Sequence, residues 1–219
     1  KYDVDNKLYI QEIFDLIPSE LNAKNKRFIL KSLNENAKYE RYKNSFLWLA
    51  DAGVALPVYN VEEPKQPLRL NELRNLFKLF LNDVGLLASC YPFELSLKII
   101  MGEANMNFGA IYENLAAQEL VAHGYSLHYF NSKRQGEIDF VVEHNGEVVP
   151  IEIKSGKDFK RHNALSNVLA TPDYDIKSAM VISNANVSTF GRITYLPVYM
   201  LMFFNPSVSS DTIVRFTPF

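Results

Sequence analysis

The sequence of 219 residues predicts a mixed α/β fold, and two patterns carry that prediction. The first is a β-hairpin, because two arms rich in β-branched residues flank Asn145-Gly146, a dipeptide that favours a two-residue hairpin turn. The second is a helix over residues 105–123, where apolar side chains recur at helical spacing and Gly124 follows as a stop signal. Helix and strand signals so close together predict an α/β (α+β) domain.

Residues 1–104 have a different pattern, in which helices precede two strands. Apolar spacing predicts one helix that ends at Pro18 and another that ends at Gly53. Strands are expected over residues 54–59 and 77–81, with a charged, proline-containing turn between them. Helices followed by a two-stranded wing are typical of a winged-helix-like region, a relative of the helix-turn-helix.

Residues 105–219 are expected to form the second domain. After its helix, residues 126–130 predict a first strand, and the two hairpin arms supply the second and third. Residues 158–169 predict a short helix, and residues 178–183 predict a buried strand. The expected order is therefore helix, three strands, helix, strand.

The hairpin is expected to place charged residues opposite one another. In a two-residue loop the numbers of paired residues add up to one value, here 291, so Asp139 faces Glu152. By the same rule Glu137 faces Lys154, and alternation puts all four side chains on one face. Directly opposed acids destabilise a sheet, so we expect a divalent cation to compensate for them. The apolar face is expected to carry Ile138, Phe140, Val142, Val149, Ile151 and Ile153.

The charged face has the chemistry of a metal-dependent nuclease. Asp139 and Glu152 are oxygen ligands of the kind that Mg²⁺ or Mn²⁺ prefers, and such an ion activates water for attack on a phosphodiester. Lys154 would orient that water or stabilise the charge that develops. The alternative is a simple ion pair of Lys154 with Asp139 or Glu137, which contributes little at a surface.

The same residues resemble the PD-(D/E)XK nuclease superfamily, whose signature is an acid on one strand and acid-any-lysine on the next. Glu152-Ile153-Lys154 matches the second part, and Asp139 matches the first, although Ile138 stands where the superfamily name has a proline. The resemblance implies a restriction-endonuclease-like α-β-β-β-α-β core. It also implies a further acid from the first helix, for which Glu113 is the best match by position and Glu119 the competitor.

Nearly the whole chain is similar to the C-terminal domain of unknown function of a family of bacterial AAA-type ATPases. That resemblance implies an ATPase domain that precedes Lys1, through which alone ATP would act, because this chain has no phosphate-binding Gly-x-x-x-x-Gly-Lys loop. The matching phrases are Phe46-Leu-Trp-Leu-Ala-Asp-Ala-Gly53, Phe77-Lys-Leu-Phe-Leu-Asn-Asp-Val-Gly-Leu-Leu87, Tyr112-Glu-Asn-Leu115, Ile138-Asp-Phe140 and Pro150-Ile-Glu-Ile-Lys-Ser-Gly156.

Basic residues provide candidate contacts to nucleic acid. Residues 22–44 hold seven Lys or Arg against two Glu, and such a group could follow a phosphate backbone or simply form a solvated helix face. Gln118 is a weaker candidate for substrate contact. The candidates for nucleic-acid binding are Lys24, Lys26, Arg27, Lys31, Lys157, Lys160 and Arg161.

Composition sets limits on these functions. The net charge of −2 gives no global attraction to nucleic acid. The single cysteine, Cys90, excludes an internal disulfide and fits a cytoplasmic protein, and no apolar run is long enough to span a membrane. We therefore expect a DNA-associated nuclease domain of an ATPase, or alternatively a catalytically silent regulatory or assembly module that docks on the ATPase domain or a protein partner. An oligomer is compatible with either.

Overall fold

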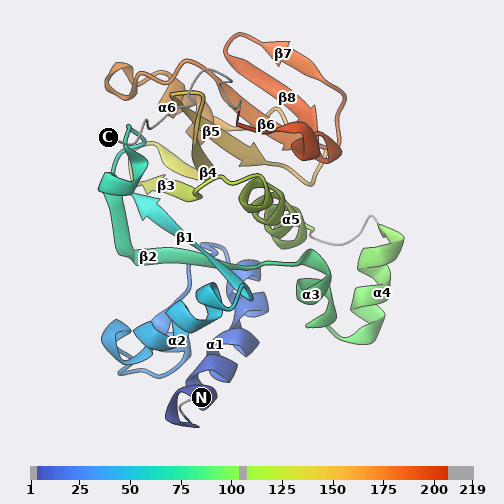
Figure 1. Cartoon of the computed structure of the whole chain (residues 1–219). Helices are drawn as coiled ribbons and strands as arrows, with labels where there is room; N and C mark the ends of the chain where they lie inside the picture. Colours follow the sequence, from blue (N-terminus) through green and yellow to red (C-terminus); the bar gives the residue numbers. More distant parts are fainter. Residues whose placement is uncertain (1–3, 104–107, 207–219) are drawn as a thin grey trace, which may run out of the picture.

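A single eight-stranded mixed sheet organises the chain in the computed structural model, which describes residues 4–103 and 108–206 (Figure 1). The strand order is β2-β1-β3-β4-β5-β6-β8-β7, and the prediction of a mixed α/β fold is confirmed. The strands are β1 Ala55–Val61, β2 Glu72–Leu81, β3 His128–Ser132, β4 Gly136–His144, β5 Glu147–Ile153, β6 Ala179–Ser183, β7 Ser188–Phe190 and β8 Ile193–Pro197. The α-helices are α1 Val4–Asn22, α2 Tyr39–Asp51, α3 Val84–Ser89, α4 Phe93–Met101, α5 Gly109–Ala122 and α6 Asn163–Leu169.

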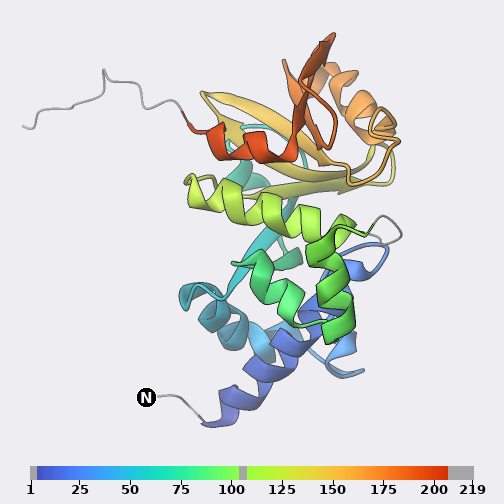
Figure 2. The ribbon, with the colours of Figure 1, turned by 90° about the vertical axis from the view of Figure 1, so that its right-hand side faces the viewer.

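Helices cover both faces of the sheet, and each face has its own hydrophobic core (Figure 2). On one face α5 buries Ala116, Ala117 and Leu120 in a core that continues down to α1 and α2. On the other face α6 buries Leu165 and Val168 against β4 and its neighbours. The site residues of α5 and β4 therefore meet between a helix and a sheet, where water is largely excluded.

The two strands of the first half belong to this sheet. β1 and β2 pair antiparallel as predicted, but β1 also pairs in parallel with β3, so the expected separate wing is wrong in this respect. Backbone hydrogen bonding thus joins residues 1–104 to the rest of the chain. Residues 104–107 lie outside the described part, and the division into two domains at this point stays a prediction.

The first helix runs beyond the proline that was expected to end it. α1 continues through Pro18 to Asn22, because Ile17 and Leu21 on either side are fully buried and their packing outweighs the one backbone hydrogen bond that proline cannot donate. The Asn22 amide also donates to the Pro18 carbonyl at 2.7 Å. The second helix ends as predicted, with Gly53 in the left-handed region at φ +67°.

The hairpin has the predicted turn and register. Phe140 pairs with Ile151 and His144 with Glu147, so the paired numbers add up to the expected value. Asn145 and Gly146 both have positive φ, as the turn requires.

A β-bulge in β4 breaks the predicted alternation of its side chains. His128 of β3 pairs with Val141, whereas Phe130 pairs with Ile138, so three steps along β4 match two along β3. The extra residue falls at Asp139-Phe140 and shifts every side chain before it to the other face. Ile138 therefore packs in the core beneath α6, while Phe140 packs in the core beneath α5, and the expectation that they share a face is wrong.

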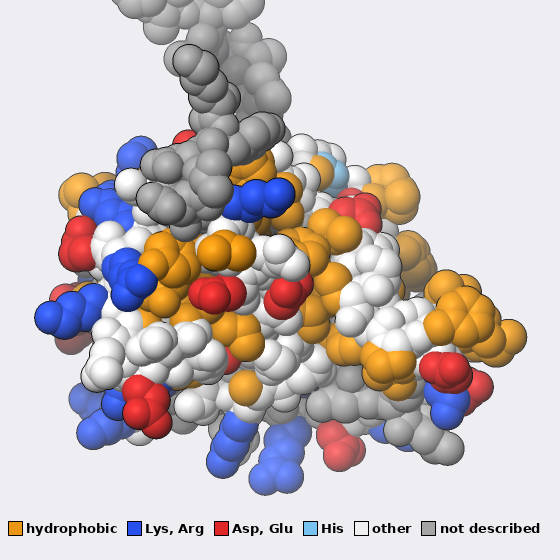
Figure 3. All heavy atoms as spheres, turned by 90° about the horizontal axis from the view of Figure 1, so that it is seen from below, with side chains coloured by type: hydrophobic (Ala, Val, Ile, Leu, Met, Phe, Trp, Pro, Cys, Tyr) orange, Lys and Arg blue, Asp and Glu red, His pale blue; other side chains and the backbone are white. Residues whose placement is uncertain are grey.

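Several elements were not expected from the sequence, including β7, β8 and the two short helices α3 and α4. No residue of α4 is buried, and its large apolar side chains form an exposed stripe at helical spacing. The stripe consists of Phe93 (77% exposed), Leu97 (39%), Ile100 (79%) and Met101 (67%). Figure 3 shows hydrophobic side chains gathered on the side of the molecule where α4 lies. Within the described ranges no helix is both long and apolar enough to cross a membrane.

Replacing Asn114 by alanine should destabilise the fold by about 2–4 kcal/mol, since it would leave two buried backbone groups without a partner. Asn114 of α5 accepts from the Leu81 N–H at 2.8 Å and donates to the Leu81 carbonyl at 2.9 Å, and so caps the edge strand β2. Urea unfolding measures the loss, with the exposed Asn36→Ala as the matched control. A loss below about 1 kcal/mol would contradict this role.

Candidate functional site

Four acidic side chains from α5, β4 and β5 gather between the helix and the sheet. All are at least partly buried, which is rare for acids unless they are paired. Their number in so small a volume requires compensating positive charge. We call this group the carboxylate cluster: Glu113, Glu137, Asp139 and Glu152.

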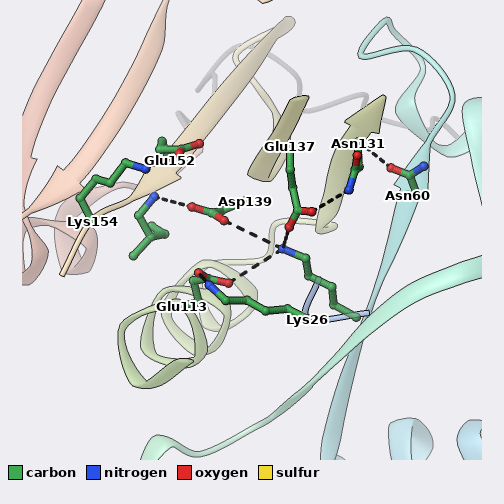
Figure 4. Close-up of polar contacts among 10 residues, drawn as sticks. Lys26, Asn60, Glu113, Asn131, Glu137, Asp139, Glu152 and Lys154 are labelled. Atoms are coloured by element: carbon green, nitrogen blue, oxygen red, sulfur yellow. Dashed lines mark hydrogen bonds and ion pairs between the residues drawn. The ribbon is translucent and has the colours of Figure 1, made fainter. Parts of the chain in front are cut away.

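The cation at the centre of the cluster is Lys78 of β2, which no sequence motif indicated. Its ammonium lies 2.7 Å from a Glu137 oxygen, and 3.9 Å from an oxygen of Asp139 and from one of Glu113. The Lys78 side chain has no exposed surface, and its Nζ lies 5.1 Å from the centre of the Tyr129 ring. In Figure 4 dashed lines from Glu113, Glu137 and Asp139 meet at one unlabelled nitrogen, which these three distances identify as that of Lys78.

Two further lysines bind the cluster from its edges. Lys26, in the loop after α1, bonds to one oxygen of Glu113. Lys154, which directly follows β5, donates to Glu152 at 2.6 Å, and the expected pair of Glu137 with Lys154 is wrong. Glu137 instead binds Lys78 and accepts from the Asn131 amide at 2.6 Å, because the bulge shifts the residues that precede it.

Asp139 lies in the bulge itself, so it is not the simple cross-strand partner of Glu152 that was expected. One of its oxygens accepts from the Ile153 N–H at 2.8 Å, so the carboxylate binds the backbone at the end of β5. Its other oxygen faces Lys78. Asp139 nevertheless lies close enough to Glu113 and Glu152 to raise the pKa of both carboxyls. The acids predicted for the site are thus brought together, through a different backbone geometry.

Burial and crowding change the proton affinities of these groups. Burial, followed by the charge of Asp139, raises the pKa of Glu113 to about 7 despite Lys78 and Lys26. The same two causes raise the pKa of Glu152 to about 8 despite Lys154. Burial alone would lower the pKa of Lys78, but the surrounding carboxylates reverse this and raise it. Glu113 and Glu152 therefore hold a proton more tightly than free glutamates do.

Two carboxylate oxygens of the cluster lack a hydrogen bond. Glu113 Oε2 and Glu152 Oε2 are buried and form no hydrogen bond to any residue in the described ranges, although Glu113 Oε2 lies 3.9 Å from the Lys78 ammonium. Among those residues no three His, Cys, Asp or Glu side chains form a group that could hold a metal. A magnesium ion, however, is commonly held by one or two carboxylates with water and a substrate phosphate, and the donors here fit that smaller set.

A hollow of about 890 Å³ lies next to the end of β5 that carries Lys154. Its walls include Tyr112, Phe159 and Lys157, and a second hollow of about 560 Å³ shares Phe159 and Lys157 with it. Lys160 and Arg161 line the second hollow, so the three basic residues predicted after β5 border open space. The lining of the first hollow includes Ser155, directly after Lys154 in the chain.

The predicted basic residues of the first half have different environments. Lys24 and Lys31 are exposed and remain available for contacts to phosphate. Lys26 binds Glu113, and the Arg27 Nε is buried without a hydrogen bond to the described part of the chain. Gln118 was expected near a substrate, but its amide oxygen accepts from the Val84 N–H at 2.8 Å and so fixes the start of α3.

Two family models match the chain, and both describe domains of unknown function. The domain of unknown function DUF4143 matches residues 108–201, which include every predicted catalytic residue. The domain of unknown function DUF8612 matches residues 2–96, which include Lys78 and Lys26. No curated protein and no solved structure matches the chain.

In metal-free buffer the free energy of unfolding should fall as the pH rises from about 4.5 to about 8 and then level off. The raised carboxyl pKa values let the folded state keep protons that the unfolded chain loses above about pH 4.5, so this stability is fully present at lower pH and is gone above the folded pKa values of about 7 and about 8. Glu152→Gln should reduce the dependence, as measured by urea unfolding, whereas the exposed Glu35→Gln should not. Equal slopes for wild type and Glu152→Gln would contradict the assignment.

Proposed function

We propose that the carboxylate cluster is a divalent-metal site that hydrolyses phosphodiesters, in a DNA-associated domain of a bacterial AAA-type ATPase. The observation that carries this proposal is the group of Glu113, Asp139 and Glu152, in which two buried carboxylate oxygens have no hydrogen bond within the described residues. A buried carboxylate oxygen without a hydrogen bond is costly, and a bound cation would offset that cost.

The order and pairing of the elements support a likeness to PD-(D/E)XK nucleases. The elements α5, β3, β4, β5, α6 and β6 follow one another as that core requires. β3, β4 and β5 form an antiparallel meander, and β6 pairs in parallel with β5. The acids stand on α5, β4 and β5, and the lysine stands two residues after the acid of β5.

Each residue then has a role in the proposed reaction. Asp139 and Glu152 would hold Mg²⁺ or Mn²⁺, which supplies an activated water and a Lewis acid when bound. Glu113 would assist from α5 as a further oxygen ligand or through a water. Lys154, which donates to Glu152 and is partly exposed toward solvent, would stabilise the negative charge that develops on the phosphate.

Contact with nucleic acid would come from basic residues around the site. Lys157, Lys160 and Arg161 line the hollows next to Lys154 and could bind phosphates along the strand. The exposed Lys24 and Lys31 would add contacts from the first half. The ATPase domain that the family resemblance implies would precede Lys1 and would supply ATP hydrolysis in the cytoplasm.

A second function is favoured by two other observations. The exposed apolar residues of α4 form a continuous stripe and are not scattered singly over the surface. Such a surface often marks a docking site. The lysines bound to the carboxylate cluster could also neutralise it without a metal. In this case the chain is a catalytically silent regulatory or assembly module that docks on the ATPase domain or on a protein partner. Failure of the metal test below would leave this function standing.

Mg²⁺ or Mn²⁺ should stabilise the fold by about 2.7 kcal/mol when present at about 100 times its dissociation constant. Melting curves and calorimetry measure this effect. Asp139→Asn should abolish it, because the amide can still accept from Ile153 N–H but has no charge for the ion. Glu119→Gln, on α5 outside the carboxylate cluster, is the matched control and should bind as wild type does. Absence of binding at millimolar metal would exclude the proposed site.

Lys154→Ala should reduce cleavage of DNA or RNA by about 10²–10³-fold while metal affinity stays nearly unchanged, because Lys154 would act mainly in the transition state. Glu152→Gln should lose both metal binding and cleavage. The assay uses the chain alone and the chain joined to its ATPase domain, with Mg²⁺ or Mn²⁺. A variant Lys154→Ala that cuts as fast as wild type would show that the assigned mechanism is wrong, and a wild type that never cuts would exclude the nuclease.

A further inference from the structure

Lys78 differs from the other lysines of the site in that it cannot leave it. Lys26 and Lys154 each keep about a quarter of their side chain exposed, at 24% and 28%, and could swing into water. The Lys78 side chain has no exposed surface and is held between three carboxylates and the Tyr129 ring. Its backbone belongs to β2, which the paired strand β1 and the Asn114 amide hold in place.

The Lys78 ammonium occupies a position where a metal cation could otherwise bind. It faces Oε2 of Glu113, Oδ1 of Asp139 and Oε1 of Glu137, three carboxylate oxygens from two different elements. Two of these distances, at 3.9 Å, are longer than a hydrogen bond, so the nitrogen acts on Asp139 and Glu113 mainly through its charge. A metal ion placed here would lie against the ammonium and be repelled by it.

The charge of the whole group limits how many ions it can take. The four acids of the carboxylate cluster and the three lysines that bind them leave one net negative charge when all are ionised. One divalent ion would leave one net positive charge. Two ions would leave three uncompensated positive charges in a largely buried space, which is strongly unfavourable.

We infer that the Lys78 ammonium permanently fills one cation position of the carboxylate cluster, so that the site binds a single divalent ion, next to Asp139 and Glu152, and never a pair. This inference rests on the proposed function. It makes Lys78 a positioning residue, which holds Asp139 and Glu113 in place without touching the substrate. Hydrolysis here would then follow a one-metal route, in which protein cations replace the second ion of two-metal sites.

The stoichiometry of Mn²⁺ binding to the wild-type chain is the first test. Calorimetry should give one ion per chain, and electron paramagnetic resonance should show isolated Mn²⁺ without the coupling of a close pair. Two coupled ions would overturn the inference and leave the proposed function intact. No bound ion would overturn the proposed function and this inference with it, so the two failures are distinguishable.

Removal of the ammonium is the second test. Lys78→Met keeps the length of the side chain and should open the position, so that two ions bind in place of one and the spectrum shows a coupled pair. Lys78→Met leaves three carboxylates facing one another, which could prevent folding. The double variant Lys78→Met/Glu137→Gln therefore removes one negative charge as well and keeps the net charge of the wild-type cluster. It should also bind a second ion, more weakly. Lys65→Met removes a surface lysine outside the cluster and should bind one ion. One ion in both Lys78 variants would overturn the inference.

Discussion

The buried ammonium of Lys78 is the interaction on which the rest of the site depends. It ties β2, from the first half of the chain, to acids on α5 and β4 in the second half. Transfer of a lysine into the interior is costly, and only several close carboxylates can offset that cost. Loss of one partner from such a group typically destabilises a fold by about 3–5 kcal/mol. The first half of the chain is therefore part of the site through charge as well as through the shared sheet.

The same ammonium explains how three of the acids can share a small buried volume. Glu137 bonds to it directly, and Asp139 and Glu113 are held at a distance where its field is still strong. Glu152 lies further along and depends on Lys154, and it retains a raised pKa. Lys154 bonds to only one oxygen of Glu152, and the other is buried without a hydrogen bond to any described residue. Under the proposed function, that free oxygen is where the metal would bind, together with Asp139.

The β-bulge in β4 is what makes this arrangement geometrically feasible. A regular strand would place Ile138, Phe140 and Val142 on one face and the three acids of β4 on the other. The extra residue shifts Glu137 to the α5 side and lets Asp139 reach the Ile153 N–H at the end of β5. Bulges are frequent next to functional sites because they redirect one side chain without disturbing the sheet beyond. Here the bulge interrupts the hydrogen bonds between the strands over a short stretch. The Asp139 carboxylate compensates for this by accepting from the Ile153 N–H.

The sequence by itself determined the local parts of this protein. Asn145-Gly146 set the turn and the register of the hairpin, and apolar spacing placed α2, α5 and β6. Alternation also placed Glu152 and Lys154 on one face, two residues apart, although their ion pair was not expected. Those features depend on neighbours within a few residues. Tertiary structure alone decided the bulge at Asp139, the continuation of α1 through Pro18, and the union of β1 with β3. It also decided the role of Lys78, which in the sequence is one lysine in an apolar strand. The physical reason is that a buried charge is tolerated only where partners from distant segments surround it, and no local pattern records which segments will meet.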